Sequence, residues 1–306
     1  MINIVKFLII FFPLLISIAI LTLVERKVLG YTQIRKGPNI VGLYGLLQPL
    51  ADGIKLFLKE PLVPNHVNIF VFILSPLLMF ILSIIVWFLI PFNFSGFILN
   101  SSISLLIILS INSVSVFSVI MAGWGSNSKY GFIGSVRATS QMISYEVSLG
   151  LIIMNISIIC YSLDLIKIYL YQESYLSLLM PLLPIFFLFF ISLIAETNRA
   201  PFDLSESESE LVSGYNIEYS GFIFALFFLG EYSHIIFSSY FICMLFTSSS
   251  VISIYLKSIV IIFIFLWIRS SFPRFRYDHL MHLLWKTYLP MSIFLFIMSG
   301  LIYIIL

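Results

Sequence analysis

The run IFVFILSPLLMFILSIIVWFLIPF, residues 69–92, contains no Asp, Glu, Lys or Arg. A helix needs about 20 predominantly apolar residues to cross the hydrocarbon core of a bilayer. Two further uncharged runs occupy residues 97–122 and 176–195. Across the 306 residues, 60% are hydrophobic and only 10% are charged, against roughly a quarter charged in an average soluble domain. The chain is therefore predicted to be an all-α, polytopic membrane protein.

About eight membrane spans fit the chain, which we interpret as a single integral membrane domain, residues 1–306. The N-terminal stretch lacks the basic region and the small-residue cleavage site of a signal peptide, so we expect it to form the first span. The long apolar run 219–256 is divided at residues 247–250, a threonine and three serines. The predicted spans lie near residues 2–24, 69–91, 100–122, 139–161, 177–195, 218–243, 250–269 and 287–306.

Lys and Arg are distributed unevenly among the connections between these spans. The first, third, fifth and seventh connections hold 13 of the 16 Lys and Arg residues. Short basic connections remain on the side of the membrane where the chain is synthesised. We therefore expect both termini on the opposite side, and all the longer charged connections on one face.

The first connection contains an amphipathic segment, residues 44–60. Its apolar residues recur at helical spacing, while Asp52, Lys55 and Lys59 lie on other faces. The segment is too short and too charged to span, so it is predicted to lie along the membrane interface as a helix. It either anchors the connection or flanks an opening toward the lipid.

Three carboxylates are placed at membrane depth. Glu146 and Glu231 lie well inside predicted spans, and Glu196 ends another; His234 follows Glu231 at a distance of three residues. A charged side chain at this depth is costly, so it normally faces the bundle interior and has a partner, or is protonated. These residues either serve as structural hydrogen-bonding groups or mark a path along which charge moves.

The segment ETNRAPFDLSESESELVSGYNIE, residues 196–218, holds six of the 14 acidic residues. Glu206, Glu208 and Glu210 alternate with serines, so they would face one way in an extended segment. Their mutual repulsion would raise their pKa values, which suits a proton store. The charge pattern alone also fits a solvated acidic loop over residues 196–217.

Several classes of function are excluded for this chain alone. Cys160 and Cys243 lie too far apart to ligate an iron–sulfur cluster by themselves, and no glycine-rich nucleotide motif is present. Asp278, His279 and His282 lack a further acid or cysteine nearby, so no metal site is predicted. A net charge of +2 gives no footprint for nucleic acid. Any redox chemistry would therefore take place on other chains, and no bound cofactor is expected here.

Short motifs in the charged connections are the most specific feature of the sequence. They are ERKVLG at 25–30, RKGPN at 35–39, GLLQPLADGIKLF at 45–57, SYEV at 144–147, ETNRAPFDL at 196–204, ESELVSG at 208–214 and PRFRYDHLMHLLWK at 273–286. Together with the length and the number of spans, these motifs resemble chain 1 of respiratory complex I, the proton-translocating NADH:ubiquinone oxidoreductase, in its mitochondrial form.

The resemblance implies a core membrane subunit with no cofactor of its own. Ubiquinone would enter from the lipid into a cavity at the junction with the peripheral arm, whose subunits hold FMN and iron–sulfur clusters. Small membrane subunits would connect the chain to antiporter-like pump subunits. The expected location is the mitochondrial inner membrane, with both termini in the intermembrane space, or a bacterial plasma membrane. Lipids are expected partners and nucleic acids are not.

The resemblance also assigns residues to two roles. The proton or charge relay would comprise Glu146, Glu196, Asp203, Glu206, Glu208, Glu210, Glu218 and Glu231. The quinone cavity would be lined by Glu25, Arg26, Arg35, Asp52, Lys55, Arg199, Arg274 and Arg276. Three positions depart from many relatives: Ser207 replaces glycine, Gly230 replaces alanine and His279 replaces glutamine. Ser207 could stiffen the acidic loop.

Two other functions fit part of the pattern. One is the membrane subunit of a related hydrogenase or formate-oxidising complex, which would not need an amphipathic opening toward the lipid. The other is a standalone proton-coupled transporter, which predicts internal repeats with broken helices. No such repeat is found in the sequence.

Overall fold

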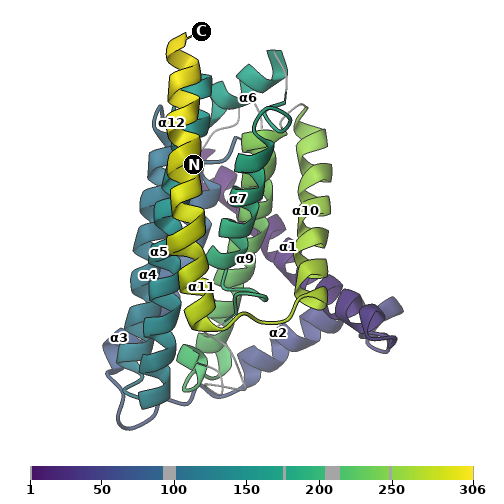
Figure 1. The fold of residues 1–306 in the computed structure, drawn as a ribbon. Helices are drawn as coiled ribbons and strands as arrows, with labels where there is room; N and C mark the ends of the chain where they lie inside the picture. The colour runs from purple at the N-terminus through teal and green to yellow at the C-terminus, as the bar shows by residue number, and fades with distance from the viewer. Residues whose placement is uncertain (1, 92–100, 175–176, 204–213, 248–249, 306) are drawn as a thin grey trace.

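The computed structural model describes residues 2–91, 101–174, 177–203, 214–247 and 250–305. Within these ranges all regular structure is helical, which confirms the predicted class. The long helices run side by side as one bundle (Figure 1). They are α1 (Ile2–Thr32), α3 (Ile69–Trp87), α4 (Ser104–Gly125), α5 (Lys129–Cys160), α9 (Gly221–Phe246), α10 (Val251–Ser271) and α12 (Leu289–Ile305).

Shorter elements connect or flank these helices. They are η1 (Leu43–Gly45), α2 (Gln48–Leu58), α6 (Leu165–Ser174), α7 (Leu183–Glu196), η2 (Gly214–Asn216), α11 (Tyr277–Leu283) and the π-helical turn η3 (Leu284–Tyr288). The turn η3 joins α11 directly to α12, so these three elements form one continuous helical segment near the C-terminus.

Seven helices of the described residues are long and apolar enough to cross a membrane. The predicted span 177–195 corresponds to α7, which has only 14 residues and is about 21 Å long at 1.5 Å per residue. A proline lies in the first turn of α7, where its missing N–H costs no hydrogen bond. The residues just before it form turns, so the helix is shorter than its apolar sequence suggests.

Two predicted spans stop short of the helices in the structure. The first predicted span ends at residue 24, but α1 continues through Glu25 to Thr32. The fourth begins at residue 139, but α5 begins ten residues earlier, where the Ser128 hydroxyl accepts a hydrogen bond from the Gly131 N–H at 3.2 Å. Apolar composition marks where the hydrocarbon ends, whereas capping marks where the helix ends. Both helices therefore project beyond the membrane region.

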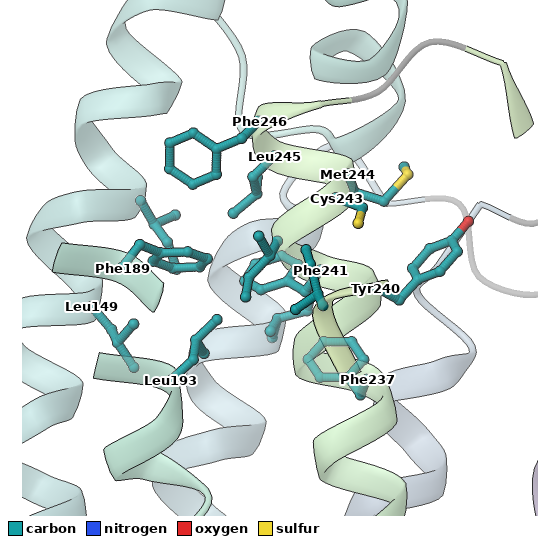
Figure 2. Close-up of a cluster of buried hydrophobic side chains, with 14 of the residues drawn as sticks. Leu149, Phe189, Leu193, Phe237, Tyr240, Phe241, Cys243, Met244, Leu245 and Phe246 are labelled. Carbon is teal, nitrogen blue, oxygen red and sulfur yellow. The ribbon is translucent and has the colours of Figure 1, made fainter. Parts of the chain in front are cut away.

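The core of the bundle is built around α9, which packs against α1, α3, α7 and α10. Every residue from Phe237 to Phe246 is buried, as expected for a helix that is apolar on all sides. Figure 2 shows Phe189 and Leu193 of α7 beside these last turns of α9. The ring of Phe189 lies 5.8 Å from that of Phe241 and 5.6 Å from that of Phe246.

The amphipathic segment forms α2 at one end of the bundle, opposite α6 and the C-terminus (Figure 1). The helix covers 48–58 rather than the whole predicted stretch 44–60, and none of its residues is buried. It contacts α1 and α9, and the Phe57 ring lies 5.1 Å from that of Phe222. Its apolar side chains are thus available to the interface.

Candidate functional site

Charged side chains meet inside the bundle around Glu25 of α1, which is only 5% exposed. The Tyr232 hydroxyl of α9 donates a hydrogen bond to Glu25 Oε2 at 2.6 Å. Arg269 of α10 pairs with Glu25 Oε1, and Arg199 Nη1 lies 4.0 Å from the same oxygen. The helical continuation of α1 beyond the predicted span keeps this carboxylate on the inner face of the bundle.

Arg199 links Glu25 to a second carboxylate, Glu231 of α9. Arg199 Nη2 lies 3.4 Å from Glu231 Oε2, and the Tyr215 hydroxyl donates to Glu231 Oε1 at 2.5 Å. The Arg199 guanidinium also lies 4.5 Å from the centre of the Tyr232 ring. Two arginines thus face two carboxylates, and this pairing offsets the large cost of removing each charge from water.

Glu196, at the end of α7, is also buried. Asn112 of α4 donates to Glu196 Oε1 at 2.7 Å, and His234 Nε2 lies 3.7 Å from the same oxygen. His234 lies one turn after Glu231 on the same side of α9. Because His234 contacts Glu196, this spacing places the surroundings of Glu231 next to those of Glu196. The other oxygen, Glu196 Oε2, has no hydrogen-bond partner among the described residues.

A small cavity of about 30 Å³ lies between these groups. Glu196, Asn198, Tyr215, Glu231 and His234 all contribute to its lining. A water molecule needs roughly 10–15 Å³ of such space and two to four polar partners. The cavity is therefore large enough and polar enough to accommodate water between Glu231 and Glu196.

Glu146 of α5 continues the series toward another face of the bundle. Its carboxyl lies beside Ser113 of α4 and within electrostatic reach of Glu196. Its neighbours Ile143 and Val147 are exposed, and Glu146 itself is half-buried. The series of carboxylates thus ends at the outer surface of α4 and α5 in the isolated chain.

At the other end of the series, Asp203 is buried beside the connection between α10 and α11. Arg274 Nη2 lies 3.3 Å from Asp203 Oδ2, and the charge of Asp203 acts on Glu231. The Phe275 N–H donates to the Pro201 carbonyl at 3.0 Å. This contact holds the two connections together near Arg199.

The predicted cavity residues divide into two groups in the structure. Glu25, Arg199 and Arg274 take part in the ion pairs described above, although the Arg274 side chain is itself exposed. The others lie on exposed or partly exposed surfaces near the same end of the bundle: Arg26, Arg35, Asp52, Lys55 and Arg276. Arg26 Nη1 lies 2.5 Å from Asp52 Oδ2, and Arg276 Nε lies 3.3 Å from Asp278 Oδ2.

The predicted relay residues are only partly covered by the structure. Glu146, Glu196, Asp203 and Glu231 form the series, and Glu218 is half-buried between η2 and α9. Glu206, Glu208 and Glu210 lie outside the described residues, as does Ser207. The proton-store and solvated-loop interpretations of that stretch therefore stay predictions.

Four groups that contact the buried carboxylates were not anticipated in that role: Asn112, Tyr215, Tyr232 and Arg269. Asn112 is an amide inside an otherwise apolar run, and such polar residues in membrane spans generally face a partner. That signal was available in the sequence. The pairing of Arg269 with Glu25 joins α10 to α1, and no local pattern predicts it.

Among the residues that the structure describes, no group of three or more His, Cys, Asp or Glu side chains is placed to hold a metal ion. Cys160 and Cys243 are both buried, and neither forms a disulfide. The donor set of a metal centre or an iron–sulfur cluster is therefore not assembled in this part of the chain.

Comparison with known proteins identifies the family. A family model described as NADH dehydrogenase matches residues 5–300. NADH-ubiquinone oxidoreductase chain 1 of Metridium senile is 51% identical, with 98% of this chain and 93% of the relative covered. The same chain of Chondrus crispus is 48% identical, with 97% of this chain and 96% of the relative covered. A bacterial relative, an NADH-quinone oxidoreductase subunit of Rhodospirillum rubrum, is 47% identical over 94% and 90%. The chain therefore belongs to the NADH dehydrogenase family that includes NADH-ubiquinone oxidoreductase chain 1.

Proposed function

We propose that this chain is a membrane subunit of a proton-translocating NADH–ubiquinone oxidoreductase of the mitochondrial inner membrane. In this role it forms much of the cavity that admits ubiquinone, and it couples quinone reduction to proton translocation. The names and coverage of its relatives support the membership in such a complex. The uneven distribution of Lys and Arg supports an orientation with both termini in the intermembrane space.

The observation that carries the proposal is the series of carboxylates from Asp203 through Glu231 and Glu196 to Glu146, of which Asp203 and Glu196 are buried and the other two are half-buried. Neighbouring members act on each other across a small polar cavity or by direct electrostatic interaction. Charges interact several times more strongly in such an environment than in water. A change of charge at Asp203 would therefore alter the protonation equilibrium of each next carboxylate in turn.

The chemistry of quinone reduction would supply that change of charge. Reduction of ubiquinone to ubiquinol consumes two electrons and two protons. The electrons would come from iron–sulfur clusters and FMN held by partner subunits, and this chain would contribute no cofactor. The arginines Arg199 and Arg274, which pair with Glu231 and Asp203, would stabilise transient negative charge in the cavity.

Under this proposal the predicted residues divide by role. Asp203, together with the acidic stretch 206–210 and Glu218, would respond to quinone charge. Glu231, Glu196 and Glu146 would transmit the response, as protons or as a change in electrostatic potential, to an adjacent membrane subunit at the α4–α5 face. Quinone would enter beside α2, where Arg26 and Asp52 form an ion pair; the exposed Arg35, Lys55 and Arg276 would face the cavity or the peripheral arm.

The test is Glu146→Gln in the intact complex, reconstituted in liposomes. Proton translocation coupled to quinone reduction is expected to fall at least tenfold, because the terminal carboxylate can no longer change charge. Oxidation of NADH by an artificial hydrophilic acceptor is expected to stay normal. Glu173→Gln, an exposed carboxylate on α6, is the matched control. Full proton translocation in Glu146→Gln would remove Glu146 from the relay.

A second measurement separates the subunit from the alternative functions. The chain should purify with flavin- and iron–sulfur-containing subunits, and inhibitors of the quinone site should block the assembly. Purification with hydrogenase subunits would favour the related quinone-free complex. Activity of the isolated chain in proton-coupled uptake would favour the transporter.

A further inference from the structure

Away from the charged series, α1 and α10 enclose a deep apolar groove of about 820 Å³, within the size range of small-molecule sites. Trp87 of α3 and Tyr240 of α9 form its floor. Figure 2 shows Tyr240 on the side of α9 opposite Phe189. The walls include Pro13, Ser17 and Ile20 of α1 and Tyr255, Ile259 and Ile262 of α10.

The groove is preformed, because α1 is held at both of its ends. At one end, the Phe7 ring lies 5.5 Å from the Phe88 ring, and the Phe11 ring lies 6.4 Å from the Phe80 ring. At the other end, Glu25 pairs with Arg269 of α10. Helix α1 therefore cannot move inward to close the space without breaking one of these contacts. Some hydrocarbon must fill it, since walls facing a void lose their dispersion contacts.

The shape of the groove selects a flexible chain over a helix. Toward Glu25 the two walls come together, because Glu25 of α1 pairs with Arg269 of α10. A transmembrane helix has a diameter of about 10–12 Å along its whole length. It would fit the wide end only, whereas an acyl chain can follow the taper. The α1 wall from Ile9 to Val24 is about 22 Å long at 1.5 Å per residue.

Three hydroxyls that line the groove donate hydrogen bonds to carbonyls of the protein. The Ser17 hydroxyl donates to the Leu14 carbonyl at 2.7 Å, and the Ser258 hydroxyl donates to the Tyr255 carbonyl at 2.8 Å. The Tyr240 hydroxyl lies 3.4 Å from the carbonyl of Pro91, to which it donates. These three hydroxyls therefore do not require hydrogen-bonding groups on an occupant.

The rims of the groove face outward at membrane depth. Ile9 and Ile20 on α1, and Ile259 and Phe263 on α10, are each at least half exposed. The medium next to these rims is the hydrocarbon of the bilayer. We propose that the groove binds one acyl chain of a membrane phospholipid, held between α1 and α10 as a structural lipid of the assembled complex.

The test uses the intact complex in bilayers that contain phosphatidylcholine with a photoreactive diazirine near the end of one acyl chain. After irradiation, labelled residues are mapped by mass spectrometry. Loosely bound lipid is washed away before irradiation. Labelling of Ser17 and Ile262 is then expected to exceed that of Ile16 and Trp267 several-fold. Ile16 and Trp267 lie on the same two helices, are exposed, and do not line the groove.

A groove-filling variant adds a second comparison. Ser17→Phe is expected to reduce the groove labelling several-fold, and the outward-facing Ile16→Phe is expected to leave it unchanged. Blue-native electrophoresis reports whether either variant assembles, and the labelling map of the wild-type complex tests the proposal independently of both variants. Groove labelling no higher than that of Ile16 and Trp267 would overturn the proposal. So would loss of labelling on addition of long-tailed ubiquinone, which would identify quinone as the occupant.

Discussion

The two halves of α9 differ in what they contact. In the part of α9 up to His234, here called its polar half, Glu231, Tyr232 and His234 each reach a charged group on another segment. Every residue from Phe237 to Phe246 in the second half is buried, mostly among apolar side chains. Between helices in lipid, close packing rather than transfer from water provides most of the attraction. We infer that the apolar half fixes the helix and the polar half uses that fixed position to align its partners.

The largest effect is expected from removal of the cation that serves the polar half. Arg199→Gln leaves Glu25 paired with Arg269 and removes the arginine that pairs with Glu231. Breaking a buried ion pair in this way typically costs about 3–5 kcal/mol, so the yield of assembled complex should fall sharply. Blue-native electrophoresis and thermal unfolding in detergent measure this.

Arg276→Gln is the matched control, because its ion pair with Asp278 is 75% and 64% exposed. Exposed pairs contribute about 0–1 kcal/mol, so its complex should assemble normally. Equal losses in the two variants would show that burial of the Arg199 network does not matter for assembly.

A slightly smaller loss is expected in the apolar half. Phe189→Ala removes a fully buried ring that contacts Phe241 and Phe246. Substitutions of this kind cost about 3 kcal/mol or more, mainly through the cavity they create. Complex that does assemble should keep its normal number of protons translocated per electron. A changed ratio would mean that the apolar half takes part in coupling, against the division proposed here.

An intermediate effect is expected at the hydrogen bond between Tyr215 and Glu231. Tyr215→Phe deletes a donor to a carboxylate, a bond worth about 1.5–3 kcal/mol. Quinone-linked turnover should fall severalfold, while NADH oxidation by an artificial acceptor should not change. Tyr219→Phe is the control, since the Tyr219 hydroxyl lies 2.9 Å from Ser75 and contacts no carboxylate. Burial raises the pKa of Tyr219 to about 12, so this control removes only a neutral hydroxyl. Comparable losses of turnover in both variants would contradict a specific role for Glu231.

The sequence predicts which polar residues lie at membrane depth better than it predicts which residues pair with them. Glu146, Glu196 and Glu231 stand out because a charge in an apolar run is rare and costly. Arg199, the partner of Glu231, and Arg269, the partner of Glu25, come from other segments of the chain, and periodicity holds no information about such contacts. The helix ends beyond residues 24 and before 139 were missed because charged residues can continue a helix outside the hydrocarbon. The groove beside α1 depends on how two helices diverge, which a single sequence does not encode locally.

The smallest stability effect is expected outside the bundle, at α2. Asp52→Asn removes an exposed ion pair with Arg26 and weakens the contact with Gln48, whose Nε2 lies 3.0 Å from Asp52 Oδ1. The change in stability should stay below about 1 kcal/mol, because both partners are solvated. Kinetics then separate the two interpretations of this helix. If α2 flanks the quinone entrance, the KM for ubiquinone should rise while kcat at saturating quinone stays close to the wild-type value. If α2 only anchors the connection, both constants should stay unchanged, and Lys59→Gln at the C-terminal end of the same helix should behave identically.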